Sequence, residues 1–286
     1  MTRNTAAEIC GRISMPKPVR KELETLEKQI SWQTEKELEV LIEKLTVPKQ
    51  WEQARRELKE QLCPDERGMK MLFCMLKAAG KSLEKYQKAG IEEKIFTDTM
   101  KCFTRFVTEH MDSFGTYGFD RDFWTGRQLS LLLFRIGELE YEKTDKGEIS
   151  IHIPSDADLS PEKCRSSIEE AKCFFAVYDP AYGEAPYTCT SWLLSPALAE
   201  LLPEESRIRR FQELFAVSQW HRESEEFLSW VYKRSDIPLE NLPENTSLQR
   251  NMKEYLRKGG KVGEGKGVLK EREKAGEHGY HTCNRR

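Results

Sequence analysis

Residues 133–153 read LFRIGELEYEKTDKGEISIHI, and this stretch decides the fold. Two runs rich in strand-forming residues, 133–142 and 148–153, flank the turn-forming tetrapeptide Thr-Asp-Lys-Gly. In the second run three isoleucines alternate with polar residues, which is the two-residue period of a half-buried strand. The stretch therefore predicts a β-hairpin.

The register of this hairpin follows from its turn. If Lys146 and Gly147 form a tight two-residue turn, Tyr141 lies opposite His152, on the face away from the isoleucines. A shift of one residue would separate the two side chains onto opposite faces.

The chain before the hairpin has a different period. Between residues 20 and 112, apolar residues recur every three or four positions and charged residues fill the opposite faces, which is typical of amphipathic helices. The turn-rich segment 114–120 marks the change of period. We therefore expect a helical N-terminal domain over residues 1–114.

After the hairpin, strands and helices are predicted to alternate. Ser160-Pro161-Glu162 has the residues that begin a helix, with serine as N-cap, proline in the first turn and an acid near the positive end. Further strands are expected at 187–192, 211–220 and 268–270, and further helices at 223–232 and 247–256. This alternation predicts an α/β domain over residues 115–270. Residues 271–286 lack an apolar period and are expected to form a disordered tail.

Composition excludes several classes of function. The chain has 286 residues and a net charge of −2, so it has no general positive field for nucleic acid or an anionic membrane. No apolar run approaches the length that spans a bilayer, and residues 1–8 contain no hydrophobic signal core. The eight cysteines form no CxxC pair and no metal-ligand spacing, which predicts buried free thiols, no metal site and a cytoplasmic location.

Several residues are candidates for chemistry. His152 could act as a general base and Tyr141 as a general acid, or the two could form a hydrogen-bonded surface pair. Glu138 and Glu140 are either solvated or functional, because an isolated buried carboxylate would be costly. Cys189 could act as a nucleophile only beside a base that the sequence does not identify, and a buried core thiol is the alternative.

Several segments resemble a bacterial family of acyltransferase-domain proteins. In that family a helical N-terminal domain precedes a GNAT-like mixed-sheet domain, GNAT being the Gcn5-related N-acetyltransferase superfamily. The resemblance rests on Tyr117–Asp120 with Phe123, Trp124 and Arg127; Leu133–Glu142; Ile151–Pro154 with Leu159–Pro161; Cys189–Pro196 with Leu201–Pro203; Ser206, Ile208, Phe211, Gln212 and Phe215; and Thr246–Arg250 with Gly259 and Gly260.

The resemblance implies an N-acyltransferase that uses acetyl-CoA or another acyl-CoA as donor and a small amine as acceptor. It also implies a loop whose backbone N–H groups hold the CoA pyrophosphate. The nearest sequence match is Arg257 with Gly259 and Gly260, although this string follows a helix. The second candidate is the strand-to-helix junction that contains Ser160, where Asp158 would repel a phosphate. The alternative from another class is a non-catalytic GNAT-like module that binds a ligand or a protein.

Overall fold

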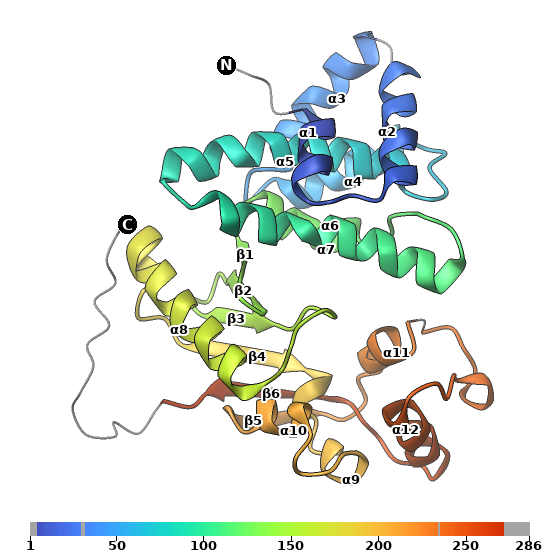
Figure 1. Ribbon diagram of the computed structural model, residues 1–286, viewed down its shortest axis with the longest axis vertical. Coiled ribbons are helices and arrows are strands. Elements are labelled where there is room, and N and C mark those ends of the chain that lie inside the picture. Colours follow the sequence, from blue (N-terminus) through green and yellow to red (C-terminus); the bar gives the residue numbers. More distant parts are fainter. Residues whose placement is uncertain (1–4, 30–31, 234, 272–286) are drawn as a thin grey trace. The chain divides into compact units, whose positions relative to one another are not determined.

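The computed structural model describes residues 5–29, 32–233 and 235–271. It divides into two compact units, Met1–Arg135 and Ile136–Arg286, of which the first is helical and the second is a mixed α/β unit (Figure 1). The predicted fold class, a helical N-terminal part followed by a GNAT-like mixed sheet, is confirmed. The predicted tail, 271–286, lies outside the described residues except for Glu271.

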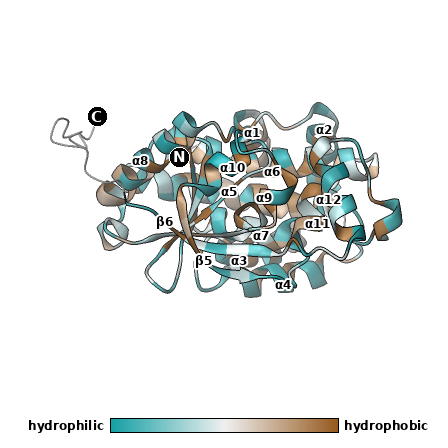
Figure 2. Cartoon of the chain, turned by 90° about the horizontal axis from the view of Figure 1, so that it is seen from below, coloured by the Kyte–Doolittle hydropathy of each residue, from teal (hydrophilic) through white to brown (hydrophobic). Residues whose placement is uncertain are grey.

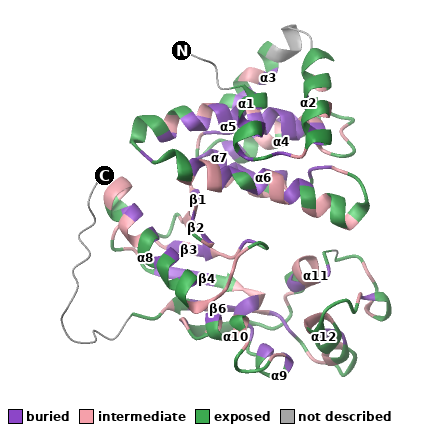
Figure 3. Ribbon diagram, viewed as in Figure 1, coloured by how far each residue is buried: buried purple, intermediate pink, exposed green. Residues whose placement is uncertain are grey.

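The first unit consists of helices packed around α5. The helices are α1 (Ala6–Arg12), α2 (Lys17–Gln29), α3 (Trp32–Lys44), α4 (Trp51–Gln61), α5 (Met69–Ala89), α6 (Glu93–Phe114) and α7 (Asp122–Leu129). Apolar and polar residues alternate around these helices (Figure 2), and α5 contributes a long run of buried side chains to the core (Figure 3). The unit therefore holds together by the burial of amphipathic faces, as the sequence predicts.

The division at Arg135 falls later in the chain than the expected boundary between residues 114 and 115. Helix α6 does end at Phe114, but α7 packs back onto α4. The Arg55 guanidinium donates to the Asp122 carboxylate at 2.6 Å, and a Cβ on Gly126 would lie only 2.0 Å from the Trp51 ring. These contacts attach residues 115–135 to the helical unit.

The second unit is built on the sheet. Its elements are β1 (Leu133–Ile136, which contains the division), β2 (Leu139–Lys143), β3 (Ile149–His152), α8 (Pro161–Tyr178), β4 (Tyr187–Ser191), α9 (Leu198–Leu201), α10 (Arg207–Gln212), β5 (Phe215–His221), α11 (Glu226–Val231), the 3-10 helix η3 (Leu239–Asn241), α12 (Ser247–Arg257) and β6 (Glu264–Leu269). The strand order is β1-β2-β3-β4-β6-β5. Strands β3 and β4 are parallel, whereas β2/β3, β4/β6 and β5/β6 are antiparallel.

The hairpin forms, but its register differs from the prediction by one residue. Glu140 lies opposite His152, and Tyr141 lies opposite Ile151. The reason is the turn. Thr144 N–H donates to the Glu148 carbonyl, so three residues form the loop and Gly147 takes the left-handed conformation with φ 73°. The expected juxtaposition of Tyr141 and His152 is therefore wrong.

Two other expectations need correction. The predicted strand 211–220 is in fact the end of α10 followed by β5, because Ser206 caps a short helix by accepting a hydrogen bond from the Arg209 N–H. Among the described residues, six cysteines have free thiols, five of them buried, but Cys173 is disulfide-bonded, so the expectation of free thiols fails for that residue.

Candidate active site

The strands β3 and β4 separate soon after they begin. They are parallel neighbours, and their register covers Ile149 opposite Tyr187 and Ser150 opposite Thr188. β3 continues to His152, whereas β4 continues to Ser191 along β6. Where neighbouring parallel strands diverge, backbone groups face a gap instead of a partner strand, and ligands bind preferentially at such places. The part of the two strands beyond their paired positions, here called the β3–β4 split, is the centre of the candidate site.

The chain leaves β3 through residues 153–160 and enters α8 (Figure 1). Ser160 is the N-cap residue of α8, and Pro161 occupies its first turn. The first turn of a helix presents backbone N–H groups and a partial positive charge, which favour an anion. The β3–β4 split and the beginning of α8 are therefore joined by one short loop.

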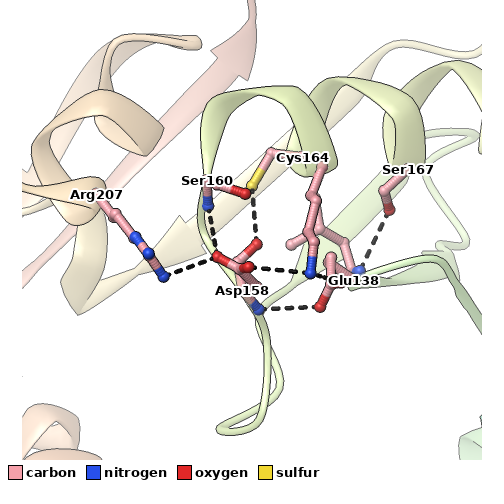
Figure 4. Close-up of polar contacts among 8 residues, drawn as sticks. Glu138, Asp158, Ser160, Cys164, Ser167 and Arg207 are labelled. Carbon is pink, nitrogen blue, oxygen red and sulfur yellow. Dashed lines mark hydrogen bonds and ion pairs between the residues drawn. The ribbon is translucent and has the colours of Figure 1, made fainter.

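A carboxylate already lies at the beginning of α8 (Figure 4). The Asp158 carboxylate accepts from the Ser160 N–H at 3.0 Å, and it forms ion pairs with Lys163 at 3.0 Å and Arg207 at 3.0 Å. The hydrogen bond from Lys163 lowers the pKa of Asp158 below its ordinary value. The repulsive aspartate is visible in the sequence, but its pairing with Arg207 is not, because Arg207 approaches from α10, a separate element.

Glu138 stabilises the loop that carries Asp158. Its carboxylate accepts from the Asp158 N–H at 2.9 Å and lies 3.5 Å from the Lys163 Nζ. Figure 4 shows Glu138 directed toward Asp158 from the turn between β1 and β2. Glu138 thus lies beside the beginning of α8, where it contacts Asp158 and Lys163.

His152 and Tyr141 point to opposite faces of the sheet. The His152 Nε2 lies 2.8 Å from the Glu142 carboxylate, and about a fifth of each side chain is exposed. The Tyr141 ring is buried against α8, and its hydroxyl hydrogen-bonds the Ser167 Oγ at 2.8 Å. Burial raises the pKa of Tyr141 well above its ordinary value. Tyr141 is therefore a core residue here, whereas His152 keeps contact with solvent and a carboxylate partner.

Cys189 lies in the middle of β4 and is fully buried. Burial raises the pKa of its thiol, so the thiolate form is disfavoured at neutral pH. The structure brings Cys189 close to the β3–β4 split in the sheet but makes it a poor nucleophile. This agrees with the alternative that it is a core thiol.

The other expected phosphate ligands do not join Ser160. Arg257 is the last residue of α12, and Gly259 and Gly260 follow its end, with Gly259 in the left-handed conformation at φ 81°. This is a helix C-terminus, where carbonyl groups carry the partial negative charge and disfavour an anion. The residues of the glycine-rich string therefore end a helix in this structure.

Gly259 and Gly260 instead border a cavity of about 450 Å³. Its walls come from the segment after β5, from α11 and η3, and from the segment between α12 and β6. They are Arg222–Glu225, Phe227, Leu228, Ser235, Ile237, Leu239, Leu242, Leu256 and Gly259–Val262. Sequence analysis missed this cavity because much of its apolar wall lies in the irregular segment 235–242. The only signal there was the leucine and isoleucine content between prolines.

Among the described residues no helix is long and apolar enough to cross a membrane. Within that same part of the chain, no group of three or more histidine, cysteine, aspartate or glutamate side chains could hold a metal ion. The tail residues His278, His281 and Cys283 lie outside the described residues.

Comparison with known proteins agrees with this architecture. Residues 4–131 match an N-acyltransferase N-terminal domain, and residues 133–269 match a GNAT-like C-terminal domain. The curated proteins contain no match. A solved acyltransferase in complex with decanoyl-CoA and teicoplanin superposes with a TM-score of 0.76 at 21% identity, over 92% of this chain and 87% of that one.

Two further solved structures are similar. An acyltransferase in complex with decanoyl-CoA superposes with a TM-score of 0.75 at 23% identity, over 92% of this chain and 86% of that one. One in complex with CoA and 10C-teicoplanin gives 0.77 at 21% identity, over 93% and 87%. These superpositions show the shared fold. Because the two domain models together match nearly the whole chain, in the same order as its two structural units, the chain belongs to the GNAT-type acyltransferases with a helical N-acyltransferase N-terminal domain.

Proposed function

We propose that this protein transfers an acyl group from acyl-CoA to an amine of a small-molecule acceptor, with the thioester held in the β3–β4 split. The observation that carries the proposal is the parallel pair β3/β4, whose register covers two positions before the strands diverge. Backbone N–H groups that face such a gap can donate to the thioester carbonyl. They stabilise the negative charge that develops on this oxygen during attack by the amine.

The phosphate groups of the donor are proposed to lie at the beginning of α8. Ser160 begins that helix, and Lys163 and Arg207 supply two cations beside it. Both cations now pair with Asp158, so donor binding requires a phosphate to replace that carboxylate. The exchange is chemically reasonable because a phosphate accepts the same hydrogen bonds and carries more charge than a carboxylate. Glu138 would keep a positioning role by holding the backbone of Asp158.

His152 is the proposed base. The nitrogen of the acceptor amine forms the new bond to the acyl carbon, the carbon–sulfur bond breaks, and the amine proton passes to the imidazole. Glu142, 2.8 Å from the His152 Nε2, stabilises the imidazolium that results. The CoA thiolate takes up a proton from solvent. Tyr141 is not used as the acid in this scheme, because its hydroxyl is buried and bonded to Ser167.

The donor is proposed to carry a medium-length acyl chain. Acyltransferases of the same fold are complexed with decanoyl-CoA and with octanoyl-CoA, and one of them also with teicoplanin. The ligands of these proteins support a donor with an acyl chain longer than that of acetyl-CoA, and they support a small-molecule acceptor. The chemical identity of that acceptor is left as the broad class of primary amines.

A thermal-shift series tests the proposal. The purified protein is heated with CoA, acetyl-CoA, octanoyl-CoA or decanoyl-CoA. A ligand present at a hundred times its Kd stabilises the folded state by about 2.7 kcal/mol, which raises Tm by several degrees. The proposal predicts such a rise with CoA and its thioesters. If none of the four raises Tm, the proposal fails. If they bind but no amine in a broad panel releases free CoA thiol, the non-catalytic binding module becomes the better description.

A further inference from the structure

We propose that the cavity between the end of β5 and the beginning of β6 binds the acyl chain of the donor and so sets the preference for chain length. This inference rests on the proposed function and adds a substrate subsite to it. The cavity, of about 450 Å³, is within the range of sites that enclose a small molecule. Figure 1 shows α11 and α12, which contribute to its walls, together beside the sheet.

The position of the cavity follows from the topology of the sheet. β5 and β4 are both antiparallel to β6, so β5 runs in the same direction as β4 and β3. The carboxyl ends of these three strands and the first residue of β6 consequently lie at the same end of the sheet, measured along the strands. The cavity walls begin directly after β5, at Arg222, and end directly before β6, at Val262. The cavity and the β3–β4 split therefore lie at the same end of the strands.

The separation suits an acyl chain. β6 and β5 are the first and second strands beyond β4, and neighbouring strands lie about 4.8 Å apart, so the cavity begins about 5–10 Å across the sheet from the carboxyl end of β4 at Ser191, the far end of the split. An extended chain advances about 1.2 Å per bond, so octanoyl and decanoyl chains reach roughly 8–11 Å. An acetyl group would not leave the split.

Apolar packing connects the two places. A hydrophobic core cluster that includes Phe227, Leu242 and Val262 forms part of the cavity wall. Trp192, the residue after the end of β4, packs against this same cluster. Packed apolar side chains therefore extend from the end of β4 to the cavity wall, and an acyl chain placed among them would be shielded from water.

Three of the four charged residues in the wall, all except Glu225, already have partners, which favours an uncharged occupant. Lys261 and Glu223 form an ion pair at 2.9 Å, and the Arg222 guanidinium stacks on the Trp220 ring at 5.5 Å from its centre. These charged groups are engaged with each other or with an aromatic ring. The wall also includes the half-buried side chains of Leu228, Leu239 and Leu256, which can contact a ligand by apolar burial.

The test compares affinities across chain lengths by isothermal titration calorimetry. Each methylene that becomes buried strengthens binding by about fourfold, so decanoyl-CoA should bind wild type at least about a hundredfold more tightly than acetyl-CoA. Leu228→Trp and Leu239→Trp, which fill the cavity, should weaken decanoyl-CoA by tenfold or more and leave CoA and acetyl-CoA within about twofold. The matched control is Leu248→Trp, because Leu248 packs on the same cluster but does not line the cavity.

The outcomes are separable. If wild type binds CoA, acetyl-CoA and decanoyl-CoA with equal affinity, the acyl-chain subsite is refuted while the proposed function stands. If no CoA species binds, the proposed function itself fails. If decanoyl-CoA binds tightly but both cavity-filling variants retain wild-type affinity for it, the chain lies elsewhere and the cavity assignment is overturned. The wild-type series decides the first two outcomes even when a tryptophan variant does not fold.

Discussion

The His152 Nε2 lies 2.8 Å from the Glu142 carboxylate, on the sheet face opposite to the one that α8 covers at Tyr141. The His152 imidazole can exchange a proton with a ligand because about a fifth of the side chain is exposed. The neighbouring carboxylate holds the ring in one orientation through this contact. This pair is the group to which the proposed function assigns proton transfer.

His152→Ala should lower kcat by about a hundredfold or more and leave the Kd for CoA within about twofold, because a general base acts in the transition state and does not hold the donor. Glu142→Gln should lower kcat less. Steady-state kinetics and calorimetry give the two quantities. Ser150→Ala, on the same strand face, is the matched control. A His152→Ala enzyme with wild-type kcat would exclude the base assignment.

Cys189→Ala should retain activity, because the thiol is fully buried and its pKa is raised by that burial. A direct transfer needs no acyl-enzyme, so intact-protein mass spectrometry after incubation with acyl-CoA should show no added acyl mass on Cys189. Loss of turnover in Cys189→Ala, in a variant that keeps its Tm, would point instead to a covalent intermediate.

Tyr141→Phe should leave kcat unchanged and cost about 1 kcal/mol of stability, the usual value of one buried hydrogen bond. The raised pKa of Tyr141 also sets a pH dependence. Because folding favours the neutral phenol, its contribution is complete below the unfolded pKa of about 10 and is lost as pH rises above it. Wild-type Tm should therefore fall more steeply than that of Tyr141→Phe above pH ~10. Identical slopes would contradict the burial assigned to this hydroxyl.

Arg207→Ala should weaken CoA binding by about tenfold, because it removes one of the two cations at the beginning of α8. Asp158→Asn should strengthen CoA binding by a few fold, because it removes the competing charge from the same place. Calorimetry with CoA measures both. Arg210→Ala, in the same helix but paired with Glu213, and Asp145→Asn, in the exposed hairpin turn, are the controls. Weaker binding by Asp158→Asn would contradict a phosphate at this position.

Local sequence patterns predicted the types of the elements better than the register in which the strands pair. The apolar periods identified the helical half, the hairpin and α8, whose serine–proline beginning has a direct physical cause. The hairpin register was missed by one residue, since Gly147 permits a three-residue loop as readily as a two-residue turn. That single shift moved Tyr141 into the core and gave His152 a different partner, Glu142.

The candidate site depended on contacts between distant segments. Asp158 was visible in the sequence, but Arg207 joins it from a helix 49 residues later in the chain. The cavity is walled by residues from the irregular segment 235–242, which has neither a helical nor a strand period. Such long-range proximity is set by the packing of the whole unit, so a single sequence does not reveal it.

Hydrogen–deuterium exchange with and without saturating CoA tests the central claim most directly, because the claim assigns the donor to particular backbone groups. The account predicts slower exchange of amides in residues 151–164 and 188–192, which border the β3–β4 split and begin α8, with residues 69–89 of α5 as an internal reference. Binding of CoA without protection in those two segments, or with protection elsewhere only, would contradict it.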